Sequence, residues 1–190
     1  MSPVVATRAV FLDRDGTINV DHHYLSKPEQ FEFIPGAERA LRELQDAGFR
    51  LIIVTNQSGI GRGYYTLSDL EAIHARMLGL LEPTGVVFDR IYFAPESPEE
   101  PSRGRKPSPA FLFDARDEFG IDLSRSFMVG DKWADVEAGR NAGCARSLLI
   151  RTGYGAETER KKTADLGSTI VVDDLPAAAA WILAEQAAGR

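Results

Sequence analysis

The chain has 190 residues, a length that suits one domain spanning residues 1–190 with a sizeable core. It is 44% apolar and 26% charged, and its net charge of −6 argues against a general nucleic-acid binder, which needs a basic surface. The single cysteine, Cys144, excludes internal disulfides and a cysteine-based zinc cluster, and no signal peptide or membrane-length apolar run occurs, so a cytoplasmic protein without a membrane partner is expected.

Apolar, strand-like runs alternate with helical segments along the chain. The expected strands are residues 8–13, 50–55, 90–94, 127–130, 147–150 and 169–172. The expected helices between them are residues 36–48, 66–82, 108–119 and 133–142. Ser68 and Glu71 form a capping-box pattern in the second helix, and Ser108 is the expected cap of the third, with Pro109 in its first turn. This alternation predicts an α/β fold with a doubly wound, mostly parallel sheet.

Two aspartates, Asp13 and Asp15, follow the first expected strand in the sequence FLDRDGTIN. Like charges this close together are costly unless a cation or a shared proton offsets them, so the pair is a candidate metal and catalytic site. A solvated turn is the alternative interpretation. A calcium loop is excluded, because it needs glycine at its sixth position and glutamate at its twelfth, where this chain has Ile18 and Tyr24.

Further polar groups follow other expected strands. The second strand runs into Thr55-Asn56-Gln57-Ser58 and Gly59, a turn whose N–H, hydroxyl and amide groups suit phosphate oxygens. Asp131 and Lys132 follow the fourth strand, and Lys106 precedes a helix N-terminus, where an anion is favoured. Each pattern alone is common in surface turns. Ligands collect at the carboxyl ends of parallel strands, however, so their joint occurrence there indicates one site.

These groups suit the hydrolysis of a phosphate monoester. Asp13 can act as a nucleophile that forms an aspartyl-phosphate, and Asp15 can protonate the leaving alcohol and then accept a proton from water. Mg²⁺ binds one or two carboxylates and a phosphate oxygen in such sites, and Asp131 would supply the other carboxylate. Lys106, with residues 55–56 as hydrogen-bond donors, would stabilise charge on the transferring phosphoryl group.

The set DRDGT, TNQS, RKP and GDKWAD resembles the four motifs of the haloacid dehalogenase superfamily in its phosphatase form, over about residues 9–153. FLDRDGTIN, VTNQSGIGRG and MVGDK further resemble the group of heptose-bisphosphate and histidinol-phosphate phosphatases. The resemblance implies that Asp13 is the nucleophile and Asp15 the acid/base. It also implies that Asp13, the backbone carbonyl of Asp15 and Asp131 hold Mg²⁺.

The resemblance also implies a set of substrate contacts. These are Asp21, His22, His23, Tyr24, Thr55, Asn56, Gln57, Ser58, Arg105, Lys106 and Lys132. From the residues alone, a His-His pair on a loop is more typical of solvated side chains, and His74 is expected on a helix surface.

One departure from the wider group concerns the loop before the Arg-Lys pair. Many members hold a structural zinc, with three cysteines and a histidine, in the loop before the Arg-Lys pair. That loop reads APESPEEPSRGRKP here and has none of the four ligands, so no zinc is expected. No insertion between the motifs is large enough for a cap domain, so short loops should cover the site.

The expected reaction is the Mg²⁺-dependent removal of the 7-phosphate from D-glycero-D-manno-heptose 1,7-bisphosphate. Histidinol phosphate and other small sugar phosphates are alternative substrates. A nucleic-acid 3′-phosphatase would need a basic groove, and a phospho-receiver module has no need of a leaving-group acid such as Asp15. We therefore expect a small phosphosugar as the partner, no nucleic acid, and a monomer.

Overall fold

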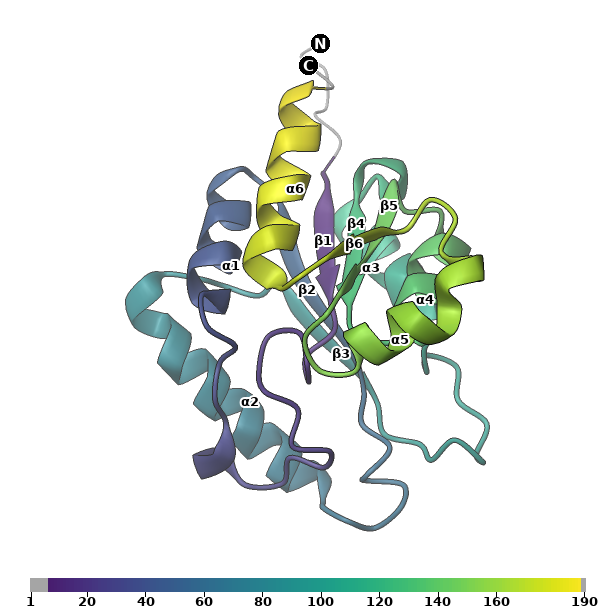
Figure 1. Cartoon of the computed structure of the whole chain (residues 1–190). Helices are drawn as coiled ribbons and strands as arrows, with labels where there is room; N and C mark the ends of the chain where they lie inside the picture. The colour runs from purple at the N-terminus through teal and green to yellow at the C-terminus, as the bar shows by residue number, and fades with distance from the viewer. Residues whose placement is uncertain (1–6, 189–190) are drawn as a thin grey trace.

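The computed structural model describes residues 7–188, which contain a six-stranded parallel sheet in the order β3-β2-β1-β4-β5-β6 (Figure 1). The strands are β1 (Ala9–Leu12), β2 (Arg50–Asn56), β3 (Arg90–Ala94), β4 (Phe127–Gly130), β5 (Arg146–Ile150) and β6 (Ile170–Val172). The α-helices are α1 (Ala37–Asp46), α2 (Leu67–Leu81), α3 (Ala110–Phe119), α4 (Trp133–Ala142), α5 (Gly155–Lys162) and α6 (Leu175–Ala188). Short 3-10 helices are η1 (Pro28–Gln30), η2 (Glu82–Thr84), η3 (Leu123–Arg125) and η4 (Thr163–Asp165). The predicted doubly wound α/β fold is confirmed.

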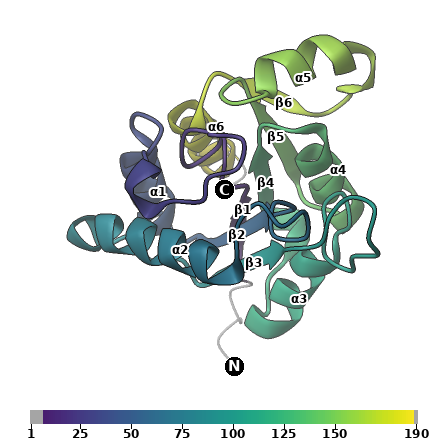
Figure 2. The ribbon, with the colours of Figure 1, turned by 90° about the horizontal axis from the view of Figure 1, so that it is seen from below.

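Helices cover both faces of the sheet, and this explains why β1 is apolar at every position. Val10 and Leu12 face a core shared with α1, α2 and α6, whereas Ala9 and Phe11 face a second core with α3 and the end of α4 (Figure 2). All four side chains are fully buried. A strand that is buried on both faces carries a continuous apolar run instead of alternating polar residues.

The order in which the chain adds strands to the sheet reverses direction at β1. Leu12 pairs with Ile53 of β2 on one side and with Val129 of β4 on the other, so β1 and β4 end at nearly the same level and β2 continues beyond them to Asn56. The chain builds β2 and β3 outward from one edge of β1, and β4, β5 and β6 from its other edge. Such a switch point opens a crevice at the carboxyl ends of the strands. The loops that follow β1, β2 and β4 therefore meet at that crevice (Figure 2).

Two predicted helix caps are wrong by one or two residues. The capping box of α2 uses Thr66 and Asp69 instead of Ser68 and Glu71: Asp69 N donates to Thr66 Oγ1, and Thr66 N donates to Asp69 Oδ2. Extended backbone at Thr66 makes it the N-cap, which places Ser68 inside the first turn. The N-cap of α3 is Pro109, one residue after the predicted Ser108.

The sequence analysis did not include α5 and α6 among the expected helices. α5 buries only Gly155, so it has no apolar stripe to reveal it. α6 is alanine-rich and packs on α1 through Ala178, Ala179 and Ile182. None of the helices within residues 7–188 has the length and apolar character needed to cross a bilayer.

Candidate active site

The side chains of Asp13 and Lys106 meet at the bottom of the crevice. Lys106 Nζ donates to Asp13 Oδ1 at 2.8 Å and to the Val54 carbonyl at 2.7 Å, and lies 2.6 Å from Asp135 Oδ1. Burial alone would lower the pKa of Lys106, but the carboxylates of Asp13 and Asp135 raise it above its ordinary value. The ammonium group therefore stays charged beside the carboxylate that the sequence analysis selected as the nucleophile.

Asp131 follows β4 and completes a cluster of three buried carboxylates. Asp13, Asp131 and Asp135 each offer one oxygen, and these oxygens lie within 4.8 Å of one another. Burial raises the pKa of Asp131 to about 8; Lys132 opposes this shift, and the charges of Asp13 and Asp135 add to it. Asp131 Oδ1 is buried without a hydrogen-bond partner. A divalent cation would relieve both the repulsion and the unpaired oxygen, so these residues fit Mg²⁺.

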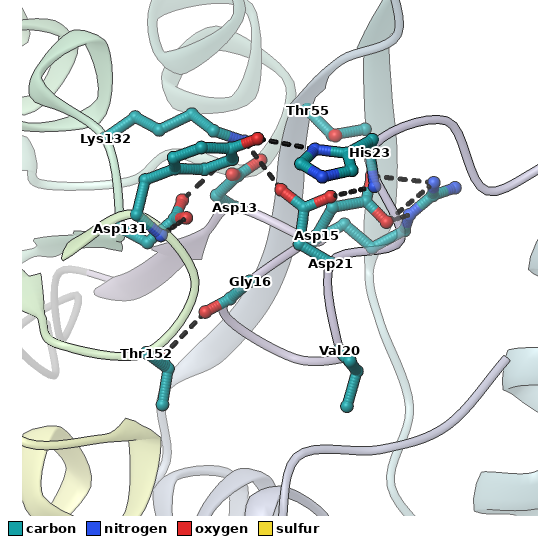
Figure 3. Close-up of polar contacts among 12 residues, drawn as sticks. Asp13, Asp15, Gly16, Val20, Asp21, His23, Thr55, Asp131, Lys132 and Thr152 are labelled. Atoms are coloured by element: carbon teal, nitrogen blue, oxygen red, sulfur yellow. Dashed lines mark hydrogen bonds and ion pairs between the residues drawn. The ribbon is translucent and has the colours of Figure 1, made fainter. Parts of the chain in front are cut away.

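Two glycines allow neighbouring loops to approach Asp131. Gly16 and Gly153 have positive φ angles of 84° and 54°, and a Cβ on either one would collide with the Asp131 carboxylate. Thr152 Oγ1 donates to the Gly16 carbonyl at 2.7 Å, which ties the two loops together (Figure 3). Any residue with a side chain at these positions would thus disturb the carboxylate cluster.

Asp15 is held as a carboxylate by three donors. Arg14 Nη2 lies 2.8 Å from Oδ2, Asn19 Nδ2 donates to Oδ1 at 2.9 Å, and Gln57 Nε2 donates to Oδ2 at 2.9 Å. Burial would raise the pKa of Asp15, but the Arg14 charge and these hydrogen bonds lower it to about 2. These donors hold Asp15 ionised in the free protein, and it must exchange one of them before it can carry a proton.

The sequence analysis missed the groups behind Asp15. Arg14 is fully buried, and its Nη1 lies 3.1 Å from Nε2 of His74. His74 is half-buried instead of lying on the helix surface as expected, and burial next to Arg14 lowers its pKa to about 4. Tyr65 donates to Gln57 Oε1 at 2.6 Å. The one signal in the sequence was an arginine between two aspartates.

The four predicted residues at the end of β2 and in the turn after it lie in different surroundings. Thr55 Oγ1 accepts a hydrogen bond from Gln57 Nε2, so its own proton remains free to donate. Asn56 uses both ends of its amide on the Lys106 backbone: Nδ2 donates to the carbonyl, and Oδ1 accepts from N. Its side chain therefore positions Lys106, and its second amide N–H is left over for another acceptor. Ser58 lies on the wall of a larger, adjoining cavity.

Two adjoining cavities open at the crevice. The smaller, of about 40 Å³, contains Asp13, Thr55 and Lys106. The larger, of about 280 Å³, is lined by Asp15, Asp21, His23, Tyr24, Leu25, Asn56, Gln57, Ser58, Gly59, Tyr65, Arg105, Lys132 and Tyr154. Asp15, Asn56 and Lys132 line both cavities, whereas Arg105 lines only the larger. This arrangement provides a small compartment for a phosphoryl group and a larger one for the rest of a substrate.

The loop after β1 supplies one wall of the larger cavity. Asp21 Oδ2 accepts from Lys132 Nζ at 3.3 Å, and His23 Nδ1 hydrogen-bonds Tyr154 OH at 2.6 Å (Figure 3). Tyr24 also lines the cavity, but His22 is exposed and does not. Tyr154 was not among the predicted residues, because nothing in its local sequence connects it to a loop so far away.

Hydrogen bonds within the loop before Arg105, which lacks zinc ligands, connect its residues to one another. Ser102 Oγ donates to Glu96 Oε2 at 2.7 Å and accepts from Arg105 N, while Arg105 Nη1 donates to the Glu96 carbonyl. Glu100 Oε2 accepts from Ser97 N at 2.7 Å. These contacts fix the position of Arg105 at the cavity.

Comparisons with known proteins agree with this geometry. A family model described as HAD-hydrolase-like matches residues 104–178. The D-glycero-beta-D-manno-heptose-1,7-bisphosphate 7-phosphatase of Haemophilus ducreyi is 42% identical over 176 residues, covering 89% of this chain and 97% of that protein. The protein of the same name from Escherichia coli K12 is 44% identical and covers 83% of this chain and 86% of its own length. The chain belongs to the haloacid dehalogenase-like phosphatases.

A solved structure extends the comparison to the fold of this phosphatase. The D,D-heptose 1,7-bisphosphate phosphatase of B. bronchiseptica, complexed with magnesium and phosphate, superposes with a TM-score of 0.88 at 33% identity. The match covers 94% of this chain and 99% of that one. This phosphatase therefore shares its fold, over most of the chain, with a relative that was solved in complex with magnesium and phosphate.

Proposed function

We propose that this phosphatase removes the 7-phosphate of D-glycero-D-manno-heptose 1,7-bisphosphate with the help of Mg²⁺. The observation that carries the proposal is the pair of adjoining cavities. The smaller holds Asp13 and Lys106, and the larger presents Arg105, which lies outside the phosphoryl compartment. A sugar with two phosphates fits this arrangement, with one phosphate at Asp13 and the other within reach of Arg105. The names of the relatives support the same substrate.

In the first half of the reaction, an Asp13 oxygen attacks phosphorus and the ester P–O bond breaks. The leaving alkoxide takes a proton from Asp15, which yields the alcohol and an aspartyl-phosphate. Lys106 Nζ, 2.8 Å from Asp13 Oδ1, orients the nucleophile and offsets the charge that accumulates around phosphorus. The free hydroxyl proton of Thr55 can donate to a phosphoryl oxygen.

In the second half, water attacks the phosphorus of the aspartyl-phosphate and gives a proton to Asp15. The bond between Asp13 and phosphorus breaks, which restores the Asp13 carboxylate and releases phosphate. The low pKa of Asp15, about 2, keeps it ionised, and it takes this proton when one of its three donors is exchanged. Asp13, Asp131 and the backbone carbonyl of Asp15 would hold Mg²⁺, which supplies positive charge to the phosphoryl oxygens when bound.

Mg²⁺ binding should release protons near neutral pH. Without the cation, Asp131 has a pKa of about 8, so much of it is protonated at about pH 7, and a bound cation would displace that proton. Calorimetry in buffers of different ionisation enthalpy should find release approaching one proton per site at about pH 7. Release should fade as the pH rises well above 8. If the number of protons released is the same at about pH 7 and well above pH 8, the assignment of Asp131 as a ligand is contradicted.

Arg105 should determine the preference for a bisphosphate. Its planar guanidinium can bind phosphate in bidentate fashion, and such a bond contributes about 1.5–3 kcal/mol. Arg105→Ala should therefore lower kcat/KM for the bisphosphate at least about tenfold. Hydrolysis of p-nitrophenyl phosphate should stay within about twofold of wild type, because that ester has no second anion.

A matched control for Arg105 lies on the same loop. Arg103 donates to both oxygens of Asp114 at 2.6 Å and does not line the larger cavity, so Arg103→Ala should leave the preference unchanged. If histidinol phosphate is the better substrate by kcat/KM, or if Arg105→Ala slows every substrate equally, the heptose assignment fails and the phosphatase activity alone remains.

Four finer points are also proposals. We propose that residues 1–190 form one domain, which the packing of the described helices on one sheet supports. We propose that no structural zinc is used, because the loop at residues 95–107 contains neither cysteine nor histidine. We propose that the protein is a monomer and acts in the cytoplasm. Light scattering of the purified protein measures its molar mass and so tests the proposed monomer.

A further inference from the structure

The loop after β1, here called the entrance loop (residues 20–25), contributes Asp21, His23, Tyr24 and Leu25 to the wall of the larger cavity. On one side, the ring of Tyr24 packs edge-on against Tyr64, with centroids 4.7 Å apart. On the other side, Asp21 pairs with Lys132 and His23 hydrogen-bonds Tyr154 (Figure 3). The entrance loop is therefore attached to two separate segments of the chain beside this cavity.

His23 has a backbone conformation that non-glycine residues rarely adopt. Its φ is 64°, and it is the one non-glycine residue with positive φ within residues 7–188. Such a residue costs about 1 kcal/mol or more and persists where its surroundings hold it in place. Two bonds do so here: His23 N donates to Asp21 Oδ1 at 2.6 Å, and Nδ1 bonds Tyr154 OH at 2.6 Å. The bridge to Tyr154 is thus part of what fixes the loop.

Tyr154 connects the entrance loop to the carboxylate cluster. Its backbone N donates to Asp131 Oδ2 at 2.8 Å, and its ring lies 4.9 Å from Lys132 Nζ. The preceding Gly153 packs directly on Asp131, so the backbone of Tyr154 has little freedom. The hydroxyl of Tyr154 consequently gives the entrance loop a fixed point that is built on the same residues as the phosphoryl site.

We propose that Tyr154 and His23 form a specificity-determining bridge, which holds the entrance loop as a wall around the sugar part of the substrate. Both are positioning residues for that wall. The inference rests on the proposed function, because it assigns the larger cavity to the leaving group. The bridge should then matter for a substrate that fills the larger cavity and should not matter for one with a very small leaving group.

Two conservative variants isolate the bridge. Tyr154→Phe removes the hydroxyl but keeps the ring beside Lys132 and the backbone bond to Asp131. His23→Asn removes the imidazole but tolerates positive φ, so it does not add backbone strain. Tyr92→Phe is the matched control, because its hydroxyl bonds Glu118, and neither residue lines the two cavities.

The experiment measures KM and kcat for heptose 1,7-bisphosphate and for acetyl phosphate in both single variants and in the double variant. Each single variant should raise KM for the bisphosphate about threefold to tenfold, the range expected for one lost hydrogen bond. The double variant should raise it no further, since both changes break the same bond. For acetyl phosphate, KM and kcat of all three variants should stay within about twofold of wild type. For the Tyr92→Phe control, KM and kcat should do so with both substrates.

Three results would overturn the bridge. Multiplying effects in the double variant would mean that the two side chains act independently. Equal losses with acetyl phosphate would mean that Tyr154 acts through Asp131 and the phosphoryl site. Unchanged KM values would mean that the wall does not depend on the bridge. If wild-type protein ignores the heptose bisphosphate, the proposed function fails separately, and the same cycle is run with the best sugar phosphate found.

Discussion

Replacing Asp13 by asparagine should lower phosphate release at least about 10³-fold, equivalent to about 4 kcal/mol of transition-state stabilisation. An amide cannot form the aspartyl-phosphate, so only positioning and electrostatic effects remain. The fold should survive, because Lys106 keeps its contacts with Asp135 and the Val54 carbonyl. Removing one of three clustered carboxylates also relieves repulsion among them. Phosphate release and a thermal melting curve, recorded on the same preparation, check both expectations.

The control for Asp13→Asn is Asp117→Asn. Asp117 is an exposed carboxylate that pairs with Arg116, and it lines neither cavity, so its loss should not affect turnover. A folded Asp13→Asn variant that keeps more than about a tenth of the wild-type kcat, a barrier change below about 1.4 kcal/mol, would rule out Asp13 as the nucleophile.

Replacing Asp15 by asparagine should slow turnover about 10²- to 10⁴-fold, the usual contribution of a general acid/base. The two half-reactions should respond differently. With acetyl phosphate, whose leaving group needs little help from an acid, Asp13 should still become phosphorylated. Hydrolysis of the intermediate should then be slow, because no carboxylate accepts the proton of the attacking water.

Acid quenching followed by peptide mass spectrometry distinguishes the two half-reactions. The Asp15→Asn variant should accumulate a phosphoryl group on the peptide that contains Asp13, whereas the double variant with Asp13→Asn should show none. Turnover near the wild-type rate would show that Asp15 is not the acid/base. A phosphoryl group on any other peptide would place the nucleophile elsewhere.

The positions of Asp13 and Asp131 were predictable because they follow strands. Both aspartates directly extend buried apolar runs, and the carboxyl ends of parallel strands share one edge of the sheet. β1 and β4 proved to be neighbours, which brings the two carboxylates together. Predicting each strand from its apolar residues was therefore enough to predict that the carboxylates lie in one region. It was not enough to predict their hydrogen bonds.

Contacts between distant segments were not predictable in this way. Arg14 and His74 are separated by 60 residues, and His23 and Tyr154 by 131. Neither His74 nor Tyr154 has a local pattern that distinguishes it from an ordinary surface residue, because its role depends on which loop lies opposite. The small errors at the caps of α2 and α3 have local causes: Thr66 and Ser68 compete at the start of α2, and α3 begins one residue later than Ser108 predicts, with Pro109 as its N-cap.

The most direct test of the account follows D-glycero-D-manno-heptose 1,7-bisphosphate by phosphorus NMR in the presence of wild-type protein and Mg²⁺. The resonance of the 7-phosphate should disappear as that of inorganic phosphate grows, while the resonance of the 1-phosphate remains. Addition of a chelator should stop the change, and excess Mg²⁺ should restart it. Loss of the 1-phosphate instead, or no change while histidinol phosphate is hydrolysed rapidly, would contradict the proposed substrate and the assignment of the two cavities.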